Sequence, residues 1–447
     1  MASVYILSLG CDKNLVDSEV MLGLLNGAGH SFTDDPSKAE VILVNTCAFI
    51  GDAKKESIQA ILELARQKEE GCCRVLIASG CLAERYKEEI LAELPELDAV
   101  VGTASYDRIA ETVEKLLAGS EKAVRVFDDQ SRIPAAQARI LTTGGHYAYL
   151  KIAEGCDKFC AYCAIPFVRG RYRSFPMERL IREAETLVSG GVRELILVAQ
   201  ETTLYGTDLY GRKALPDLIR GLAAIPDLRW IRLLYGYPEE LTDEMIDLMA
   251  SEPKLCHYLD LPIQHAADSV LARMGRTTTK AQLRSLIGKL RERIPDIALR
   301  TTLMSGFPGE TEEEHQENLD FIREIRFDRL GAFAYSREEG TAADRMKNQV
   351  PVRIRKKRRN ELMRAQQEVA FAKAASMPGR ILEVMIEGQV AEEDTYVART
   401  YMDAPEVDGY LFLSSSEPLV SGDFVTVRVT GARNYDLMGE RTDESAE

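Results

Sequence analysis

Short apolar runs alternate with helix-like segments along most of this 447-residue chain, and this alternation limits the fold to the α/β class. In the N-terminal third the runs are continuously apolar, as the buried strands of a parallel sheet are. Helical patterns lie between them, for example at residues 17–25 and 54–66. We therefore expect an open parallel-sheet α/β domain there. Its strands are predicted at 4–9, 41–45, 75–79 and 99–102.

A second series of the same kind predicts a partial (β/α)6 barrel, because it has six repeats where a closed barrel of this type has about eight. Helical segments at 177–189 and 279–293 lie between its strands. The catalytic groups of such barrels lie at the carboxyl ends of the strands. The strands are predicted at 148–153, 194–199, 230–234, 257–261, 299–304 and 330–335.

The last part of the chain changes to a period of two, which is typical of a small antiparallel β-barrel. Strands are predicted at 380–387, 395–399 and 423–429. Residues 376–447 carry 5 Arg, no Lys and 15 Asp plus Glu, a net charge of −10. An acidic surface repels a phosphate backbone, so a basic protein is a better partner for this barrel than a nucleic acid.

A chain of this length is too long for a single hydrophobic core. We expect an N-terminal domain at 1–118, a linker at 119–145, a central domain at 146–375 and the small barrel at 376–441. The linker is predicted from the polar run at 128–132 and the Gly144-Gly145 pair.

Cys156, Cys160 and Cys163 stand in a loop-like run directly after the strand predicted at 148–153. Three thiolates at this C-x3-C-x2-C spacing can hold three irons of a cubane cluster and leave the fourth iron open to a small molecule. The alternatives are a structural zinc site without its fourth ligand, and three unrelated thiols.

Three further cysteines follow the first three predicted strands: Cys11, Cys47 and Cys81. Because the carboxyl ends of parallel strands lie at one edge of a sheet, these thiols are predicted to converge on a second three-thiolate site. The alternative is that each is a small apolar residue at a strand end. The remaining cysteines are interpreted as structural: Cys72, Cys73 and Cys256.

The composition is that of an ordinary globular protein, with 45% apolar and 28% charged residues. No apolar run approaches the length of a membrane span and the N-terminus does not resemble a signal peptide, so we expect a cytoplasmic protein. In a reducing compartment, nine cysteines favour metal ligation over disulfides. The net charge of −15 argues against broad nucleic-acid binding. A basic helix is predicted at 353–359. It is interpreted as a solvated helix face, and the alternative is a contact with RNA.

The cysteine loop, with Tyr162 before its last cysteine, resembles the signature of radical S-adenosylmethionine (SAM) enzymes. Over essentially its full length the chain resembles one family of these enzymes, the methylthiotransferases, which join an auxiliary-cluster domain, a radical SAM domain and a C-terminal TRAM barrel. Within that family it is most similar to the branch that modifies an aspartate of a small-subunit ribosomal protein. The matching stretches are LGCDKNLVDSE (9–19), NTC (45–47), QETTLYGTD (200–208), YLDLPIQH (258–265) and GFPGET (306–311).

Four positions depart from the family pattern without removing a cysteine. Asp12 stands where proline is usual, Glu201 where aspartate is expected, and Ser305 where valine is common. Phe175 replaces a second arginine and weakens any expectation of an arginine contact there.

The resemblance implies a transferase that uses two 4Fe–4S clusters and two SAM molecules. One cluster, on Cys156, Cys160 and Cys163, takes an electron from a low-potential donor such as flavodoxin and cleaves SAM to a radical. The radical removes hydrogen from the β-carbon of the target aspartate, a step that only a cofactor can carry. The auxiliary cluster, on Cys11, Cys47 and Cys81, holds the sulfur that is methylated and transferred.

Two other functions compete with this expectation. Methylthiolation of a tRNA adenosine would use the same chemistry, but the acidic barrel speaks against it. A non-enzymatic iron–sulfur or zinc scaffold would leave the strand-end motifs unexplained. SAM contacts are expected from residues in the cysteine loop and at the strand ends. Packing, an ordinary salt bridge or the shaping of a turn are the alternatives for these residues. Gln264 and His265 are expected to line the active-site cavity, and the alternative for His265 is a hydrogen-bonded structural role. The contact candidates are Tyr162, Gln200, Glu201, Arg300 and Gly306.

Overall fold

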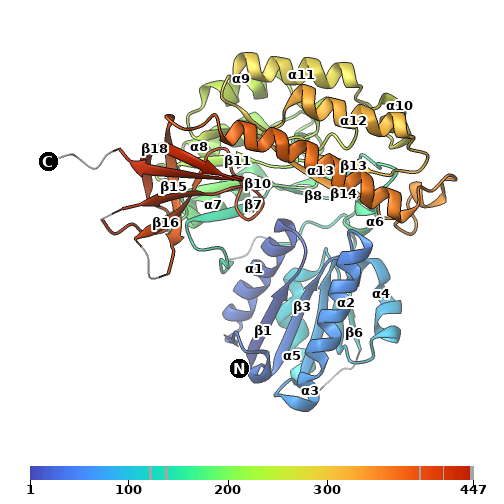
Figure 1. Cartoon of the computed structure of the whole chain (residues 1–447). Coiled ribbons are helices and arrows are strands. Elements are labelled where there is room, and N and C mark those ends of the chain that lie inside the picture. Colours follow the sequence, from blue (N-terminus) through green and yellow to red (C-terminus); the bar gives the residue numbers. More distant parts are fainter. Residues whose placement is uncertain (120–122, 136–138, 392–393, 416, 443–447) are drawn as a thin grey trace. The chain divides into compact units, whose positions relative to one another are not determined.

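The computed structural model describes residues 1–119, 123–135, 139–391, 394–415 and 417–442 (Figure 1). The chain divides into two compact units, and each is built from stretches that are separate in the sequence. Unit 1 comprises 1–142, 153–175 and 336–344, and unit 2 comprises 143–152, 176–335 and 345–447. The cysteine loop therefore belongs to the same unit as the N-terminal sheet.

Unit 1 is built on a six-stranded parallel sheet with the order β2-β1-β3-β4-β5-β6. The three strands that precede a cysteine, β1, β3 and β4, are neighbours in this order. The strands are β1 Ser3–Ser8, β2 Ser31–Phe32, β3 Val41–Thr46, β4 Val75–Gly80, β5 Ala99–Val101 and β6 Val124–Val126.

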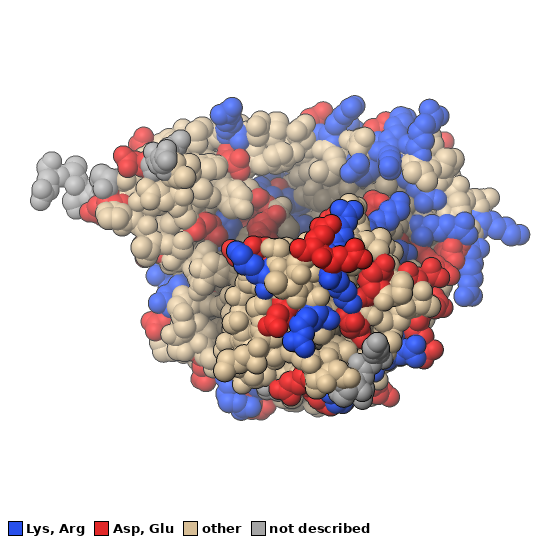
Figure 2. Space-filling model, turned by 90° about the horizontal axis from the view of Figure 1, so that it is seen from below, with Lys and Arg blue, Asp and Glu red and all other residues tan. Residues whose placement is uncertain are grey.

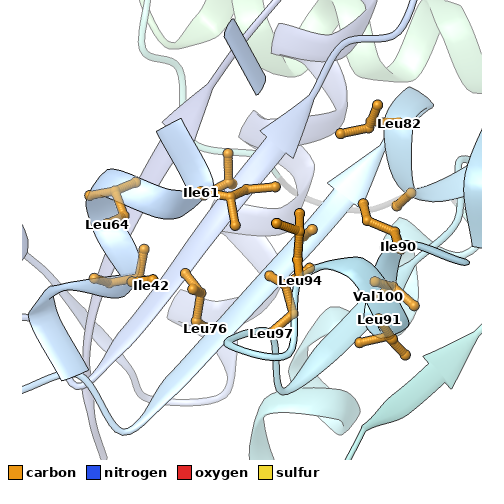
Figure 3. Close-up of a cluster of buried hydrophobic side chains, with 14 of the residues drawn as sticks. Ile42, Ile61, Leu64, Leu76, Leu82, Ile90, Leu91, Leu94, Leu97 and Val100 are labelled. Atoms are coloured by element: carbon orange, nitrogen blue, oxygen red, sulfur yellow. The ribbon is translucent and has the colours of Figure 1, made fainter. Parts of the chain in front are cut away.

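Helices cover both faces of this sheet because successive apolar side chains of its strands point to opposite sides. Ile42 and Val44 of β3 pack in one buried cluster with helices α2 and α4, as Figure 3 shows in part. Val41 and Leu43 pack in another cluster with α1 and α5. The helices of this unit are α1 Asp12–Gly27, α2 Gly51–Ala65, α3 Gln67–Glu70, α4 Cys81–Glu93, α5 Ile109–Leu117 and α6 Ile165–Val168, and a short hairpin joins β8 Ala153–Glu154 and β9 Arg173–Ser174.

Unit 2 contains a second six-stranded parallel sheet, with the order β14-β13-β12-β11-β10-β7, and helices lie between consecutive strands. This is the predicted partial (β/α)6 barrel. Its strands are β7 Tyr147–Lys151, β10 Glu194–Val198, β11 Trp230–Leu233, β12 Leu255–Asp260, β13 Ala298–Ser305 and β14 Arg329–Ala334. Its helices are α7 Met177–Ser189, α8 Leu215–Ala223, α9 Asp243–Ser251, α10 Asp268–Arg273, α11 Lys280–Arg293, α12 Glu312–Ile325 and α13 Val352–Ala374.

The C-terminal residues form a closed five-stranded barrel with the order β15-β16-β17-β19-β18. Its interior is apolar, with Val384, Ile386 and Val427 fully buried. The predicted small barrel is therefore confirmed, although the prediction lacked two of its strands. The strands are β15 Ile381–Gln389, β16 Thr395–Thr400, β17 Leu411–Ser414, β18 Phe424–Arg433 and β19 Asp436–Arg441.

A buried ionic network joins this barrel to the amino end of the unit 2 sheet. The Glu194 carboxylate of β10 accepts hydrogen bonds from Arg232 Nε at 2.7 Å and from Arg399 Nη2 at 2.6 Å. All three side chains are fully buried. Arg399 Nε also donates to Glu387 Oε1 at 2.7 Å. Because Arg232 belongs to the sheet and Arg399 to the barrel, one carboxylate ties the two together.

Most of the strands that the predictions omitted are short, although β19 has six residues. The predicted linker contains β6, which pairs with β5, and the prediction omitted the two-residue β2 as well as β17 and β19. Three-residue strands carry too few side chains to show a period. None of the helices that the structure describes is both long and apolar enough to cross a membrane.

Candidate iron–sulfur centre

Cys11, Cys47 and Cys81 lie at the carboxyl ends of three neighbouring strands of unit 1. Cys11 caps the N-terminus of α1, Cys47 follows β3, and Cys81 is the first residue of α4. The backbone between strand and helix is tight: Gly10 has φ +95°, and a Cβ there would stand 2.9 Å from Cys47 Sγ. The fold therefore brings together three thiols that are 36 and 34 residues apart in the sequence.

Asn14 makes polar contacts at the three strand ends that carry Cys11, Cys47 and Cys81. Its Nδ2 donates to the carbonyl oxygens of Leu9 and Thr46, both at 2.9 Å, and so links the first two strand ends. Its Oδ1 lies 3.8 Å from Cys81 Sγ, the thiol at the third strand end. One side chain thus holds all three strand ends in register.

Arg169 is a fully buried cation between this group and the cysteine loop. Its Nη1 donates to Asp17 Oδ2 at 2.8 Å and to Glu154 Oε2 at 3.1 Å. Its Nη2 donates to Asn14 Oδ1 and, at 3.4 Å, to Cys81 Sγ. Arg169 could not be predicted as a buried residue, because an arginine in the run FVRGRYR gives no sign of burial.

The thiols of Cys11, Cys47 and Cys81 lie close enough to interact electrostatically. Burial raises the pKa of Cys81 to about 12; Arg169 opposes this, and Cys11 and Cys47 raise it further. Burial also raises the pKa of Cys47, with a contribution from Cys11. Without a metal these buried thiols hold their protons, and a bound cation would displace them.

The second cysteine set lies between β8 and β9, in the same unit. Cys156 N donates to Gly170 O at 3.2 Å, and Cys163 N donates to Cys160 O at 2.9 Å, so the loop is folded back on itself. Cys156 and Cys160 are buried. Burial raises the pKa of the Cys163 thiol, and Cys160 and Cys156 add to the increase. The three thiols of this loop therefore also lie close enough to interact.

The loop is held in unit 1 by the segment 336–344. Ala343 N donates to Ala161 O at 2.7 Å. The buried carboxylate of Glu338 binds Lys54 and Arg85, each at 2.9 Å. The segment 336–344, which follows a long stretch of unit 2 in the sequence, thus contacts residues near both cysteine sets.

A single metal ion and a cubane cluster require different arrangements of the cysteines. Within the described part of the chain, no group of three or more His, Cys, Asp or Glu side chains is arranged to hold one metal ion. A cubane differs because each of its irons takes its own thiolate. Each set offers three thiols, which are the protein donors that a cubane with one open iron requires. Two thiols of each set are buried, whereas Cys11 is exposed and Cys163 is partly exposed.

Substituting Gly10→Ala should remove iron from one site only. The added Cβ would meet Cys47 Cβ at 2.8 Å and Sγ at 2.9 Å, in a backbone conformation that alanine disfavours. We expect anaerobically reconstituted protein to lose about four of about eight irons. Gly27→Ala is the control, because nothing lies within 4 Å of a Cβ at Gly27. Unchanged iron content in the Gly10 variant would contradict the assignment.

The predicted SAM contacts lie in both units and keep the status of predictions. Tyr162 is half-buried within the cysteine loop of unit 1. Gln200 and Glu201 follow β10 of unit 2, and Glu201 is fully buried. The Glu201 carboxylate accepts hydrogen bonds from Thr203 N at 2.9 Å and from the Thr203 hydroxyl. A glutamate here, where the family pattern has aspartate, is therefore held in place by its own loop.

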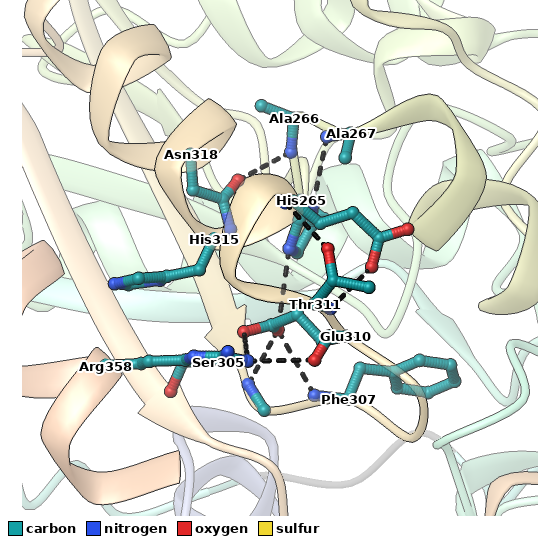
Figure 4. Close-up of polar contacts among 12 residues, drawn as sticks. His265, Ala266, Ala267, Ser305, Phe307, Glu310, Thr311, His315, Asn318 and Arg358 are labelled. Atoms are coloured by element: carbon teal, nitrogen blue, oxygen red, sulfur yellow. Dashed lines mark hydrogen bonds and ion pairs between the residues drawn. The ribbon is translucent and has the colours of Figure 1, made fainter. Parts of the chain in front are cut away.

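Gly306 begins a loop after β13 that Glu310 holds closed (Figure 4). Glu310 Oε2 accepts from Gly306 N at 2.7 Å, and Glu310 Oε1 accepts from Arg358 Nη1 at 2.9 Å. Burial raises the pKa of Glu310, but His265, Arg358 and the Gly306 amide outweigh it and leave the pKa below its ordinary value. Gly306 has φ +69°, and a Cβ there would stand 2.3 Å from Arg355 Cγ.

His265 has a structural position in this loop cluster. It is fully buried, its Nδ1 accepts from Ala267 N at 2.9 Å, and its Nε2 lies 3.5 Å from Glu310 (Figure 4). Of the two interpretations of this histidine, cavity lining and structural hydrogen bonding, the contacts favour the second.

Arg300 is engaged in ion pairs within unit 2. Its Nη1 donates to Asp260 at 2.9 Å, and its Nε lies 3.6 Å from Asp408 of the C-terminal barrel. These contacts are ordinary salt bridges. The predicted contact of Arg300 with the SAM carboxylate remains a prediction that they do not support. Three other residues differ from the family pattern. Asp12 pairs with Lys13, Phe175 is buried, and Ser305 Oγ donates to Arg355 O at 2.9 Å.

Three family models match the chain in succession. Residues 3–102 match an uncharacterized protein family, UPF0004. Residues 150–322 match the Radical SAM superfamily, which implies SAM and an iron–sulfur cluster as cofactors, and residues 379–441 match the TRAM domain. The three-part architecture expected from the resemblance is thereby confirmed.

Solved structures share the fold at low sequence identity. The radical SAM methyltransferase TsrM from Kitasatospora setae superimposes with a TM-score of 0.54 at 16% identity, over 74% of this chain and 72% of that one. The cobalamin-dependent radical SAM enzyme OxsB gives a TM-score of 0.53 at 12% identity, over 77% of this chain and 54% of the other.

Curated relatives match almost end to end. A protein of Lachnoclostridium phytofermentans named "Ribosomal protein uS12 methylthiotransferase RimO" is 56% identical over 98% of this chain and 99% of its own. Proteins of the same name from Acetivibrio thermocellus, over 99% of both chains, and from Geobacter sulfurreducens, over 98% of both, are 49% and 48% identical. The chain belongs to the RimO family of radical SAM methylthiotransferases, which are enzymes of the transferase class.

Proposed function

We propose that this protein transfers a methylthio group to the β-carbon of an aspartate in ribosomal protein uS12, with two 4Fe–4S clusters and SAM as cofactors. The substrate is supported by the name of relatives that match nearly the whole chain. The observation that supports the two-cluster proposal is the presence of two three-thiol sets, each with two buried thiols, in one compact unit.

The residues have separate tasks in this proposal. Cys156, Cys160 and Cys163 would hold one cluster, which when reduced supplies the electron for SAM cleavage, a chemistry beyond any side chain. The other three cysteines would hold the auxiliary cluster that carries the sulfur. Both sets are mostly buried, so the protein around them limits access of water and oxygen. The residues that would contact SAM are Tyr162 in unit 1 and Gln200, Glu201 and Gly306 in unit 2.

The charge of the TRAM barrel supports a basic protein substrate. Its net charge is −10, and ribosomal proteins are basic because they bind RNA. We also propose a cytoplasmic location and a low-potential electron donor of the flavodoxin kind.

Two measurements test the proposal. Iron and acid-labile sulfide should be about eight per chain in anaerobic wild-type protein and about four in either triple Cys→Ala variant. The wild type should also add the mass of a methylthio group to a uS12 peptide at its aspartate, and not to tRNA. About four irons in the wild type, falling to none in the Cys156/Cys160/Cys163 variant, would remove the sulfur-donating half of the mechanism. Modification of tRNA instead of the peptide would overturn the substrate.

A further inference from the structure

Residues 345–360, which include the first two turns of α13, contain eight Lys and Arg residues and no Asp or Glu. The chain as a whole has 56 basic residues in 447, so eight in sixteen is about four times the average density of Lys and Arg. Figure 2 shows Lys and Arg gathered toward the right of the view, the side on which α13 begins in Figure 1. This segment is the place in unit 2 where positive charge concentrates.

The structure separates these cations into two sets. Arg355 and Arg358 are buried and hold α13 on the barrel: Arg355 Nε donates to Val350 O at 2.6 Å, and Arg358 binds Glu310 at 2.9 Å. Arg353, Lys356 and Arg364 point the other way and are exposed. Because positions three, four and seven residues apart share a helix face, these cations form one stripe with Lys357. At 1.5 Å per residue the stripe is about 16 Å long.

The stripe differs from an ordinary solvated helix face. On α11 of the same unit, Arg284 pairs with Glu324 at 2.5 Å, Lys289 with Asp243 at 2.8 Å and Arg293 with Asp247 at 2.7 Å. Within the described residues, by contrast, Arg353, Lys356 and Arg364 form no ion pair, and only Lys357 has a partner, Glu361 at 3.4 Å. Three exposed cations are thus left without a counter-charge of the protein.

We propose that this stripe on α13 binds the phosphate backbone of RNA. Along the axis of duplex DNA the phosphates of one strand follow at about 3.4 Å, so a stripe of this length can face several phosphates of a nucleic-acid strand. A membrane surface fits it less well, because an interfacial helix inserts its apolar face, and the apolar face of α13, with Leu362 and Val369, is buried in the protein. The identity of the RNA rests on the proposed function: it is the ribosomal RNA next to the target protein. The enzyme then meets its substrate in a ribonucleoprotein, with the acidic barrel kept away from phosphate.

The test uses the full-length anaerobic protein and a labelled oligouridylate, with anisotropy measured over a range of KCl concentrations. The variant is Arg353→Gln/Lys356→Gln/Arg364→Gln, and the control is Arg284→Gln/Lys289→Gln/Arg293→Gln, which loses the same charge from α11. The slope of the logarithm of the binding constant against the logarithm of the KCl concentration is compared. We expect the same slope for wild type and control, and a slope smaller in magnitude by about 2 for the α13 variant, at about 0.7 for each phosphate contact.

Three outcomes would overturn the proposal: no binding by the wild type at low salt, an equal loss in both variants, or equally tight binding of anionic vesicles or polyglutamate with the same residue dependence. The α13 variant should modify a free uS12 peptide at the wild-type rate and show a raised KM on small ribosomal subunits. Failure of peptide modification by the wild type would instead overturn the proposed function and leave the RNA-binding result unaffected.

Discussion

Arg169→Gln is expected to lower the free energy of unfolding of unit 1 by about 3–5 kcal/mol, the cost of removing one partner from a buried ion pair. The variant leaves the carboxylates of Asp17 and Glu154 buried without their cation, and it removes the donor to Cys81 Sγ. The loss should appear in urea unfolding of the metal-free protein followed by far-ultraviolet circular dichroism. Because the single tryptophan, Trp230, lies in unit 2, its fluorescence should not follow the altered transition.

Arg171→Gln is the matched control for this prediction. Arg171 is two residues away and pairs with Asp157 at 3.4 Å, but its side chain is 72% exposed. An exposed pair of this kind contributes about 0–1 kcal/mol. Arg169→Lys keeps the charge, but an ammonium group cannot reach several partners as a planar guanidinium does. Its free energy of unfolding should therefore lie between those of the wild type and the glutamine variant. Equal stability of the Arg169 and Arg171 variants would show that the buried network does not hold unit 1 together.

Glu194→Gln is expected to have an effect of similar size on unit 2, about 3–5 kcal/mol at neutral pH. It leaves Arg232 and Arg399, both fully buried, without the carboxylate between them. Trp230 is a direct probe, because the Arg232 guanidinium lies 5.8 Å from its ring centre. Glu383→Gln is the control: Glu383 also joins sheet and barrel, through Arg229, but this pair is about half-exposed. A loss below 1 kcal/mol in the Glu194 variant would contradict the prediction.

The same carboxylate gives the stability of unit 2 a defined pH dependence. Burial alone would raise the pKa of Glu194, but Arg232 and Arg399 outweigh it and leave the pKa below its ordinary value of 4.5. A group with a lowered pKa in the folded state stabilises fully above its ordinary pKa, and this contribution is lost as the pH falls through the folded value. Wild-type protein should therefore lose stability below about pH 4.5, and the Glu194 variant should lack this part of the acid sensitivity.

The sequence was sufficient for the features that repeat. Continuous apolar runs predicted both parallel sheets. The rule that ligands bind at the carboxyl ends of parallel strands predicted that Cys11, Cys47 and Cys81 lie near one another. The period of two located the small barrel. These signals extend over many residues, so no single exception conceals them.

Single charged residues inside apolar elements were harder to interpret. Arg232 lies within the strand run WIRLL, and Arg399 ends the predicted strand at 395–399. Each could have indicated a buried partner, because a lone charge in a central strand must be paired. Which carboxylate serves as partner depends on tertiary structure, and Glu194 lies 38 and 205 residues away from them. The same applies to Arg169, whose partners lie as far away as Asn14 and Cys81.

The interleaving of the two units has a consequence for synthesis of the chain. The polypeptide crosses between the units five times, and unit 1 is completed only by the segment 336–344. On the ribosome the N-terminal sheet emerges first, as N-terminal segments generally do. All six candidate ligand cysteines are made well before Glu338 and Ala343, which hold their surroundings in place. Metal loading is therefore expected to follow late in translation or after release, and an N-terminal fragment ending near residue 175, which contains all six cysteines, is expected to bind either cluster poorly.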